Sequence, residues 1–198
     1  YARIRIPESY KIGNTYSILV FGLKAEDFEY AYQMDGPADQ ARGLLFNRKH
    51  TLLDPYAKAV TGQRNWGEKP EGGKDFVYKA RVVQSDFDWG RYRNLNYKFE
   101  DLVIYEMHVR GFTKDASSGV KGGGTFEGLR QKIPYLKDLG INAVELMPIF
   151  EFDEMESARV VDGVQLYNYW GYNTVSFFAP NTSYAFHQEH NHEGDELK

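Results

Sequence analysis

The sequence predicts a small β-sandwich followed by the opening of a parallel α/β sheet, on three observations. Residues 1–83 alternate large and small side chains in short segments between turns. Residues 102–109 and 141–148 are nearly continuous apolar runs, and a helical apolar stripe lies between them. We therefore divide the chain into a sandwich over residues 1–83, a connector over residues 84–100 and an α/β region over residues 101–198.

Short strands are expected at three places in the first region, namely residues 16–21, 28–33 and 76–83. Successive side chains of a strand point to opposite faces, so the alternating aromatics of 28–33 predict one buried face. Turn residues punctuate these segments, at Asp35-Gly36-Pro37 and at residues 69–73. Several short strands with such turns are typical of a small β-sandwich. Residues 1–83 are too few to hold all the strands of such a sandwich, so we expect its first strand to be missing.

The second region reads as strand, helix, strand. A continuous apolar run such as 102–109 predicts a strand covered on both faces. Thr125 is the expected N-cap of the next helix, and Pro134 should kink that helix or remove one backbone bond. Gly140 suits the helix end, and 141–148 is the second strand, which makes the sheet parallel. The helical stripe consists of Phe126, Leu129, Ile133, Leu136 and Leu139.

A long segment after residue 148 reads as one loop that runs to about Asn191. Loops of that length inside compact domains are usually functional or disordered. This one is rich in Tyr, Trp and Phe, which argues against disorder. We expect a functional loop, followed by the first turn of a helix at Asp195.

Charge and composition exclude several classes of protein. The net charge of -4 gives no case for binding nucleic acid or an anionic membrane. No apolar run reaches the roughly 18 residues of a membrane span. The absence of cysteine excludes disulfides and thiolate metal sites, and the start lacks a secretory core, so we expect a cytoplasmic protein. Aromatic residues make up 16% of the chain, which suits either sugar binding or a core.

Sequence motifs then follow one another along nearly the whole chain. They are Asp35-Gly36-Pro37, Leu53–Lys58, Ile104–Thr113, Gly140–Pro148, and Asn168–Asn173 followed by Phe177–Pro180. In this order they resemble the N-terminal sandwich, the first and second barrel strands, and the loop after the second strand of one family. That family is the isoamylases and glycogen-debranching enzymes, within the alpha-amylase family of glycoside hydrolases.

The resemblance implies a carbohydrate-binding-module-like, immunoglobulin-like sandwich and a TIM (β/α)8 barrel. Such a barrel needs eight strand–helix units and about 250 residues, whereas residues 101–198 hold two strands. We therefore interpret the chain as an N-terminal fragment. The family's catalytic carboxylates lie on later strands, so we expect no catalytic residue here and no activity from the fragment alone.

For the full-length protein the resemblance implies a retaining glycoside hydrolase that cleaves α-1,6 branch linkages in glycogen or a related α-glucan, without a cofactor. Two alternatives stay open. One is a non-catalytic, glucan-binding or regulatory protein on the same scaffold. The other is a transglycosylating relative such as a branching enzyme.

The expected sugar-binding residues come from the loop motif. Tyr172 matches the aromatic that stacks on the sugar at the cleavage subsite, and Trp170 matches a position that lines the same subsite. Tyr169 and Asn173 are further candidates. The competing interpretation of Tyr172 is a ring packed under the loop.

Four polar residues of the two strands are assigned supporting roles. Glu106 and Glu145 lie in mid-strand, whereas functional groups of such barrels cluster at the C-terminal strand ends. We expect both to be buried and hydrogen-bonded or ion-paired. His108 and Arg110 lie nearer a strand end, where we expect them to support the active-site loop.

A cluster of histidines near the C-terminus invites a metal-site interpretation, since His and carboxylates are zinc ligands. Nothing in the spacing fixes a geometry, and acidic residues also suit the start of a helix. We therefore favour a solvated loop and predict no metal site. The cluster is His187, Glu189, His190, His192, Glu193 and Asp195.

Overall fold

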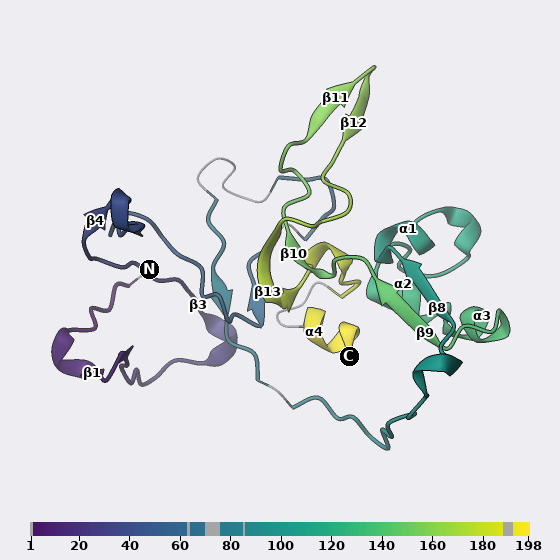
Figure 1. Ribbon diagram of the computed structural model, residues 1–198, viewed down its shortest axis with the longest axis horizontal. Coiled ribbons are helices and arrows are strands. Elements are labelled where there is room, and N and C mark those ends of the chain that lie inside the picture. The colour runs from purple at the N-terminus through teal and green to yellow at the C-terminus, as the bar shows by residue number, and fades with distance from the viewer. Residues whose placement is uncertain (1, 63, 70–75, 85, 188–191) are drawn as a thin grey trace.

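The computed structural model describes residues 2–62, 64–69, 76–84, 86–187 and 192–198. Within these ranges the strands form one three-stranded sheet and five two-stranded sheets. Short helices gather beside one parallel pair of strands, and the N-terminal hairpins lie on the other side of the molecule (Figure 1). None of the helices in these ranges has the length and apolarity needed to cross a bilayer.

The N-terminal region is made of two-residue strands. β1 and β2 form one antiparallel hairpin, β4 and β5 form another, and β7 pairs with both β3 and β6. The strands are β1 (Lys11–Ile12), β2 (Thr15–Tyr16), β3 (Glu29–Tyr30), β4 (Ala38–Asp39), β5 (Leu44–Leu45), β6 (Ala59–Val60) and β7 (Ala80–Arg81). The described ranges also contain short 3₁₀ turns, which are η1 (Glu8–Tyr10), η2 (Ala25–Asp27), η3 (Gln40–Arg42), η5 (Phe99–Asp101), η6 (Ala116–Ser118) and η7 (Thr182–Tyr184).

The predicted strands of this region are shorter than expected. Residues 17–21 are not a strand, and the Phe21 side chain is 83% exposed. A strand needs a hydrogen-bonding neighbour and a cover for its apolar face, and residues 17–21 have no strand partner in the described chain. The described residues thus form small antiparallel sheets in place of the two facing sheets of a sandwich. The predicted turn at 69–73 lies largely outside the described residues.

A small apolar cluster ties the three-stranded sheet to the C-terminal region. Val60 and Ala80 are buried against Ala179, which lies about a hundred residues later in the sequence. Beside the cluster the Tyr30 hydroxyl donates to Asp54 Oδ2 at 2.7 Å. The sheet is therefore anchored to the region that follows it.

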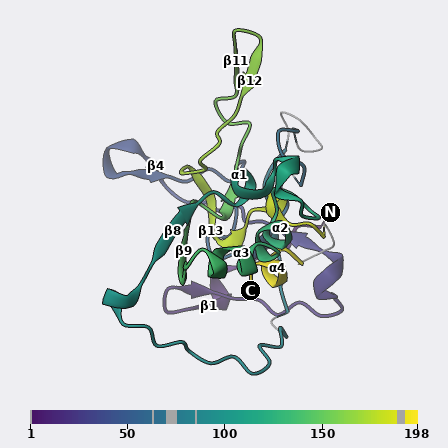
Figure 2. The same cartoon turned by 90° about the vertical axis from the view of Figure 1, so that its right-hand side faces the viewer.

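The predicted β-α-β unit is confirmed. β8 (Ile104–Met107) and β9 (Ala143–Leu146) pair in parallel, with Met107 opposite Leu146. Between them lie α1 (Val109–Thr113), α2 (Phe126–Arg130) and α3 (Ile133–Asp138), which gather beside the pair in both views (Figures 1 and 2).

Local sequence signals set the helix ends. Thr125 caps α2, because its Oγ1 accepts a hydrogen bond from the Gly128 backbone N–H at 3.2 Å. The helix breaks at residues 131–132, and Pro134 stands in the first turn of α3, where its missing N–H costs no helical hydrogen bond. At its end Gly140 takes φ +89°, and the Gly140 and Ile141 N–H groups donate to Lys137 and Leu136 carbonyls. This is a Schellman cap.

The expected burial of the parallel pair is wrong for this chain. Side chains on both strands are exposed, including Ile104 and Val144. Glu106 and Glu145 are exposed too, and they lie directly opposite each other in the register. We expected them to be buried and paired, but in the described residues β8 and β9 have only each other as strand neighbours.

The segment after β9 is a structured element and not the single loop expected. β10 (Phe150–Phe152) pairs antiparallel with β13 (Thr174–Pro180). Between them, β11 (Arg159–Val161) and β12 (Val164–Leu166) form a hairpin that projects from the body of the molecule in both views (Figures 1 and 2). Its two-residue turn, Asp162-Gly163, has positive φ at both positions, which is the geometry of a type I′ turn.

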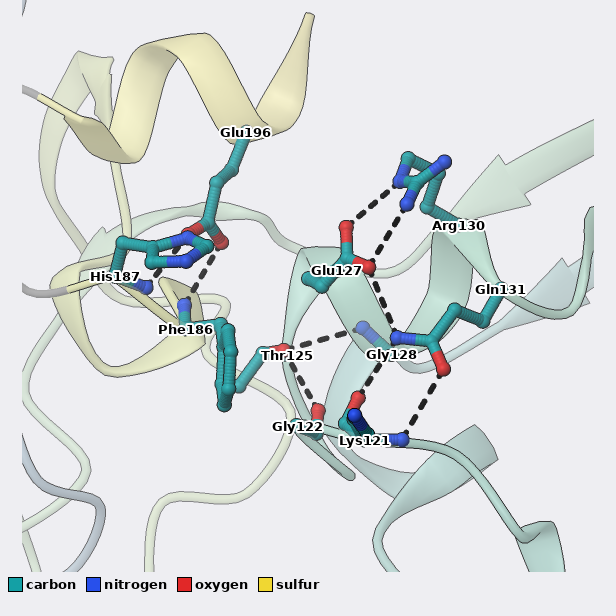
Figure 3. A network of polar contacts seen from close by, with 10 residues as sticks. All are labelled: Lys121, Gly122, Thr125, Glu127, Gly128, Arg130, Gln131, Phe186, His187 and Glu196. Atoms are coloured by element: carbon teal, nitrogen blue, oxygen red, sulfur yellow. Dashed lines mark hydrogen bonds and ion pairs between the residues drawn. The ribbon is translucent and has the colours of Figure 1, made fainter.

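The last helix, α4 (His192–Leu197), agrees with the helical turn expected at the C-terminus. Its Glu196 carboxylate accepts hydrogen bonds from the backbone N–H groups of Phe186 and His187, at 2.8 and 2.6 Å (Figure 3). The Phe186 ring in turn packs on Gly122, beside the cap of α2. The segment after β13 is thereby fastened to both α4 and α2.

Candidate functional site

Two neighbouring aromatic rings stand out from the loop between β12 and β13. Tyr172 is 67% exposed and Trp170 is 63% exposed, and their ring centroids lie 6.4 Å apart in an edge-to-face arrangement. The competing interpretation of Tyr172 as a ring packed under the loop is wrong. Both rings offer an apolar face to solvent, which is the surface that packs against a sugar ring.

The glycine between the two rings explains why they point outward. Gly171 has φ +77°, a conformation that residues with a Cβ rarely adopt. A Cβ at this position would lie 2.3 Å from Cε1 of Phe152, so the backbone itself rests on that buried ring. With the Gly171 backbone against the core, the flanking side chains are directed away from it.

Tyr169 has a different environment from Trp170 and Tyr172. Its ring stacks on His108, with centroids 4.1 Å apart and planes 5° from parallel. The His108 Nδ1 accepts from the Gly111 N–H, so its Nε2 carries the proton and donates to the Tyr169 carbonyl at 2.7 Å. Burial lowers the pKa of His108 below its ordinary value and keeps this tautomer neutral. His108 supports the loop, as we expected.

A tryptophan from the N-terminal region lies at the centre of the packing below the loop. Trp66 stacks on Tyr184 at 5.9 Å, and its ring meets those of Phe152 and Tyr169 edge to face at the same distance. The Arg110 guanidinium lies over the Trp66 ring at 4.7 Å, a cation–π contact. We call this set the Trp66 cluster; it consists of Trp66, His108, Arg110, Phe152, Tyr167, Tyr169 and Tyr184.

The Trp66 cluster was missed from the sequence. Its members come from segments that are far apart in the chain, and only contact in the folded state joins them. A partial signal is present, because Trp66 is one of only three tryptophans and stands in a turn between Asn65 and Gly67. Arg110 was expected to support the loop, and it does so through Trp66.

Two buried carboxyl groups lie under the loop. Glu154 is fully buried; its Oε1 accepts from the Gly67 N–H at 3.3 Å, and burial raises its pKa to about 7. Glu151 is also buried and accepts from the Thr182 N–H at 2.7 Å, and burial raises its pKa to about 8. Shifted carboxyl pKa values are common at catalytic sites, but these two groups have no exposed surface through which a substrate would reach them.

Amide side chains fix the ends of the loop. The Asn168 side chain donates to the Asp153 carbonyl at 3.2 Å, and its backbone N–H donates to the Glu154 carbonyl. Asn173 donates to Glu156 Oε2 at 2.5 Å. The Asn173 amide is thus held by the protein, and a sugar contact from this group would compete with Glu156.

The histidine cluster does not gather into one site in the part of the chain that is described. His187 is exposed, and its Nδ1 lies 2.9 Å from Glu196. Glu193 is buried near Arg81, with 3.9 Å between Nη1 and Oε1. Glu189 and His190 lie outside the described residues.

No family model matches the chain, but several curated proteins are similar to it over most of its length. The "Isoamylase 3, chloroplastic" of Oryza sativa subsp. japonica is 44% identical over 179 residues, which is 88% of this chain and 23% of that protein. The "Glycogen debranching enzyme" of Yersinia enterocolitica is 34% identical over 203 residues, which is 94% of this chain and 29% of that protein. The chain therefore spans about a quarter of the length of the curated relatives it matches.

Solved structures agree with these relatives. The pullulanase of Anoxybacillus sp. LM18-11, solved in complex with maltotetraose, aligns with a TM-score of 0.55 at 28% sequence identity. The alignment covers 74% of this chain and 21% of the pullulanase. The fold described above thus matches part of a pullulanase.

Proposed function

Because the chain is homologous over most of its length to one segment of the isoamylases and glycogen-debranching enzymes, we propose that the protein containing it hydrolyses α-1,6 branch linkages in glycogen or a related α-glucan. In this proposal the present residues hold the sugar. The carboxylates of a retaining mechanism lie on strands outside these 198 residues.

The observation that carries the proposal is the pair of exposed rings on a rigid support. Trp170 and Tyr172 face solvent from a loop whose backbone rests on Phe152. A flat ring in a fixed position binds a sugar by its apolar face and loses little conformational entropy on binding. Tyr172 stacks on the sugar at the cleavage point, and Trp170 lines the same subsite.

The carboxyl groups of this chain support placing the catalytic pair elsewhere. Hydrolysis of a glycosidic bond needs two carboxyl groups that flank the bond, one as acid and one as nucleophile or base. Glu151 and Glu154 are sealed in the interior, whereas Glu106 and Glu145 lie opposite each other on the exposed parallel pair β8–β9. In this proposal none of the four is the acid or the nucleophile.

The exposed parallel pair supports a barrel that continues in further strands. Apolar side chains of β8 and β9 face solvent, and each strand has an unpaired edge in the described chain. We propose that the remaining barrel strands pair with these edges, and that a completed sandwich precedes them. Residence in the cytoplasm stays a prediction.

Assays on the chain and on the longer protein that contains it test this proposal. The longer protein should release reducing ends from pullulan and amylopectin, and linear chains should accumulate without new branches. Accumulation of new branch points would favour a branching enzyme, and absence of any product would favour a glucan-binding or regulatory protein. Turnover by the 198-residue chain alone would contradict the placement of the carboxylates.

A further inference from the structure

An open hollow of about 420 Å³ lies between four segments of the chain. Its volume is within the roughly 300–1,000 Å³ that is usual for small-molecule sites. The segments are residues 64–68, residues 110–114, the glycine turn at 122–125 and residues 183–186. Gly122, Thr125 and Phe186 lie together at one side of it (Figure 3). The first segment belongs to the N-terminal region and the other three to the α/β region, so the hollow lies on the seam between the two regions.

The charged side chains around the hollow are mostly cationic. Arg64, Arg110 and Lys114 line it, and Glu68 is the only acidic residue among its described lining residues. The Asn65 side chain donates to Glu68 Oε2 at 3.0 Å, which holds that carboxylate at the segment 64–68. The chain as a whole has a net charge of -4. An excess of positive charge is therefore concentrated in one hollow of an acidic chain.

Arg110 and Lys114 lie side by side. They stand four residues apart at α1, where side chains at this spacing are neighbours. A Cβ at Gly124 would lie 3.1 Å from Lys114 Cδ and 3.3 Å from Arg110 Cγ, so both stems pass over the same glycine. Neither the guanidinium nor the ammonium group has an ion pair or a hydrogen bond in the described part of the chain. Like charges held this close repel each other, and a bound anion would relieve the repulsion.

The Arg110 guanidinium is held in place while its donors stay available. It lies over the Trp66 ring at 4.7 Å, and a cation–π contact uses none of the five N–H donors of arginine. Glu154 attracts Arg110 electrostatically but forms no ion pair with it in the described residues. Burial raises the pKa of Glu154 to about 7, so near neutral pH this carboxyl offsets only part of the positive charge.

The backbone of Arg64 is fixed in an unusual conformation at the hollow. Its φ of +60° is uncommon for a residue with a side chain, and its N–H donates to Thr182 Oγ1 at 3.2 Å. Such conformations persist only where the surrounding structure holds them, and they are frequent at functional sites. The buried Glu193 lies within electrostatic range of Arg64, so Lys114 is the cation with the most freely available charge.

We propose that this hollow is a binding site for a phosphate group, either free inorganic phosphate or the phosphate of a small ester. A phosphate monoester carries a charge of about −1.5 to −2 at pH 7, which matches three cationic residues against one acidic residue. Its oxygens accept from the planar N–H fork of Arg110 and from Lys114. The exposed Phe186 ring supplies an apolar surface for the remainder of an ester.

A bound phosphate would link the N-terminal region to the α/β region, because Arg64 comes from one and Lys114 from the other. A ligand that binds the folded state alone stabilises that state, so phosphate should raise the melting temperature of the chain. This inference concerns a site other than the exposed rings of Trp170 and Tyr172, and it does not depend on the proposed hydrolysis of a glucan.

Titration with inorganic phosphate, glucose 6-phosphate and glucose tests the site. Followed by amide NMR, both phosphates should shift the signals of Gly122 and Gly123, and glucose should not. In calorimetry Lys114→Gln should lose about tenfold in affinity for the phosphates, because one charge-assisted hydrogen bond is removed. Lys137→Gln is the matched control, since Lys137 is an exposed lysine of α3 outside the hollow, and it should bind as the wild type does.

The comparison of the two phosphates identifies the source of the group. Tighter binding of glucose 6-phosphate would assign the hollow to an ester, and equal affinity would assign it to the free ion; both results support the site. Absence of shifts at Gly122 and Gly123 in a chain with a folded amide spectrum would overturn it. Equal affinities of Lys114→Gln and the wild type, or equal losses in the Lys114 and Lys137 variants, would also overturn it. The affinity of Lys114→Gln for maltotetraose should be unchanged, which keeps this test separate from that of the proposed function.

Discussion

The Trp66 cluster adjoins the parallel pair β8–β9, because its His108 directly follows β8, but the two regions differ in how completely they are packed. The pair exposes apolar and acidic side chains and has unpaired edges in the described chain. In the cluster, rings from four other segments of the chain contact Trp66. The residues that pack under the proposed sugar-binding loop are thus present in this chain. The strands β8 and β9, by contrast, lack the neighbours that a barrel with a catalytic centre would need.

The largest effect on stability should come from removing Trp66, the ring at the centre of the Trp66 cluster. Trp66→Ala should lower the free energy of unfolding by about 3–5 kcal/mol, since it removes a large packed side chain and leaves a cavity. Thermal unfolding followed by circular dichroism measures the change. Trp89→Ala is the matched control, because Trp89 is more than half exposed in the connector and should cost less than about 1 kcal/mol. Equal costs for the two variants would contradict the difference in packing.

A single methyl group at Gly171 should have the next largest effect. Gly171→Ala should cost about 2–4 kcal/mol, because it combines the left-handed backbone with a Cβ only 2.3 Å from Phe152. Gly163→Ala, with the same sign of φ and open space around it, should cost only about 1–2 kcal/mol. Denaturant unfolding of both variants gives the comparison. A Gly171 variant as stable as the Gly163 variant would mean that the loop does not rest on Phe152.

The buried carboxyl group of Glu151 should make the stability of the folded state depend on pH. The pKa of Glu151 is raised from its ordinary 4.5 to about 8, so the folded state holds a proton that the unfolded state releases. The stability due to this proton is complete below pH 4.5 and is lost as the pH rises through about 8. The melting temperature should therefore fall between about pH 5 and 8, and Glu151→Gln should flatten that fall. A steeper fall in the variant would contradict the assignment.

The smallest effect on stability is expected at the exposed parallel pair β8–β9. Glu106 and Glu145 lie opposite each other, so Glu145→Lys replaces a like-charge pair by an attractive one. The variant should gain a few tenths of a kcal/mol in the free energy of unfolding. Because both side chains are exposed, the gain should disappear in 1 M salt. A loss of several kcal/mol would instead indicate that the two glutamates are buried.

Features controlled by neighbouring residues were predictable from the sequence. Thr125, Pro134 and Gly140 act on their own backbone, and the cap, the helix break and the helix end all occur at or near these residues. The Asp162-Gly163 turn carried a signal of the same kind, but the surrounding segment was interpreted as one loop. The hairpin was therefore missed even though its turn type follows from those two residues.

Features that depend on distant partners were not predictable. The apolar run at 102–109 predicts a strand that neighbouring elements cover on both faces. In the described residues those neighbours are absent, so the pattern did not predict the exposure of Ile104. Trp66 and Tyr184 stack although more than a hundred residues separate them in sequence. The exposed positions of Trp170 and Tyr172 were expected from the resemblance, whereas the support beneath them required the structure.

The affinity of the chain for maltotetraose tests the central claim most directly. Tyr172→Ala should weaken binding by about fivefold to tenfold, in line with the roughly 1–1.5 kcal/mol typical of one well-placed aromatic contact. Tyr92→Ala, which removes a comparably exposed ring from the connector, should leave the affinity unchanged. If Tyr172→Ala binds maltotetraose as tightly as the wild type, the exposed rings do not hold the sugar and the account is contradicted.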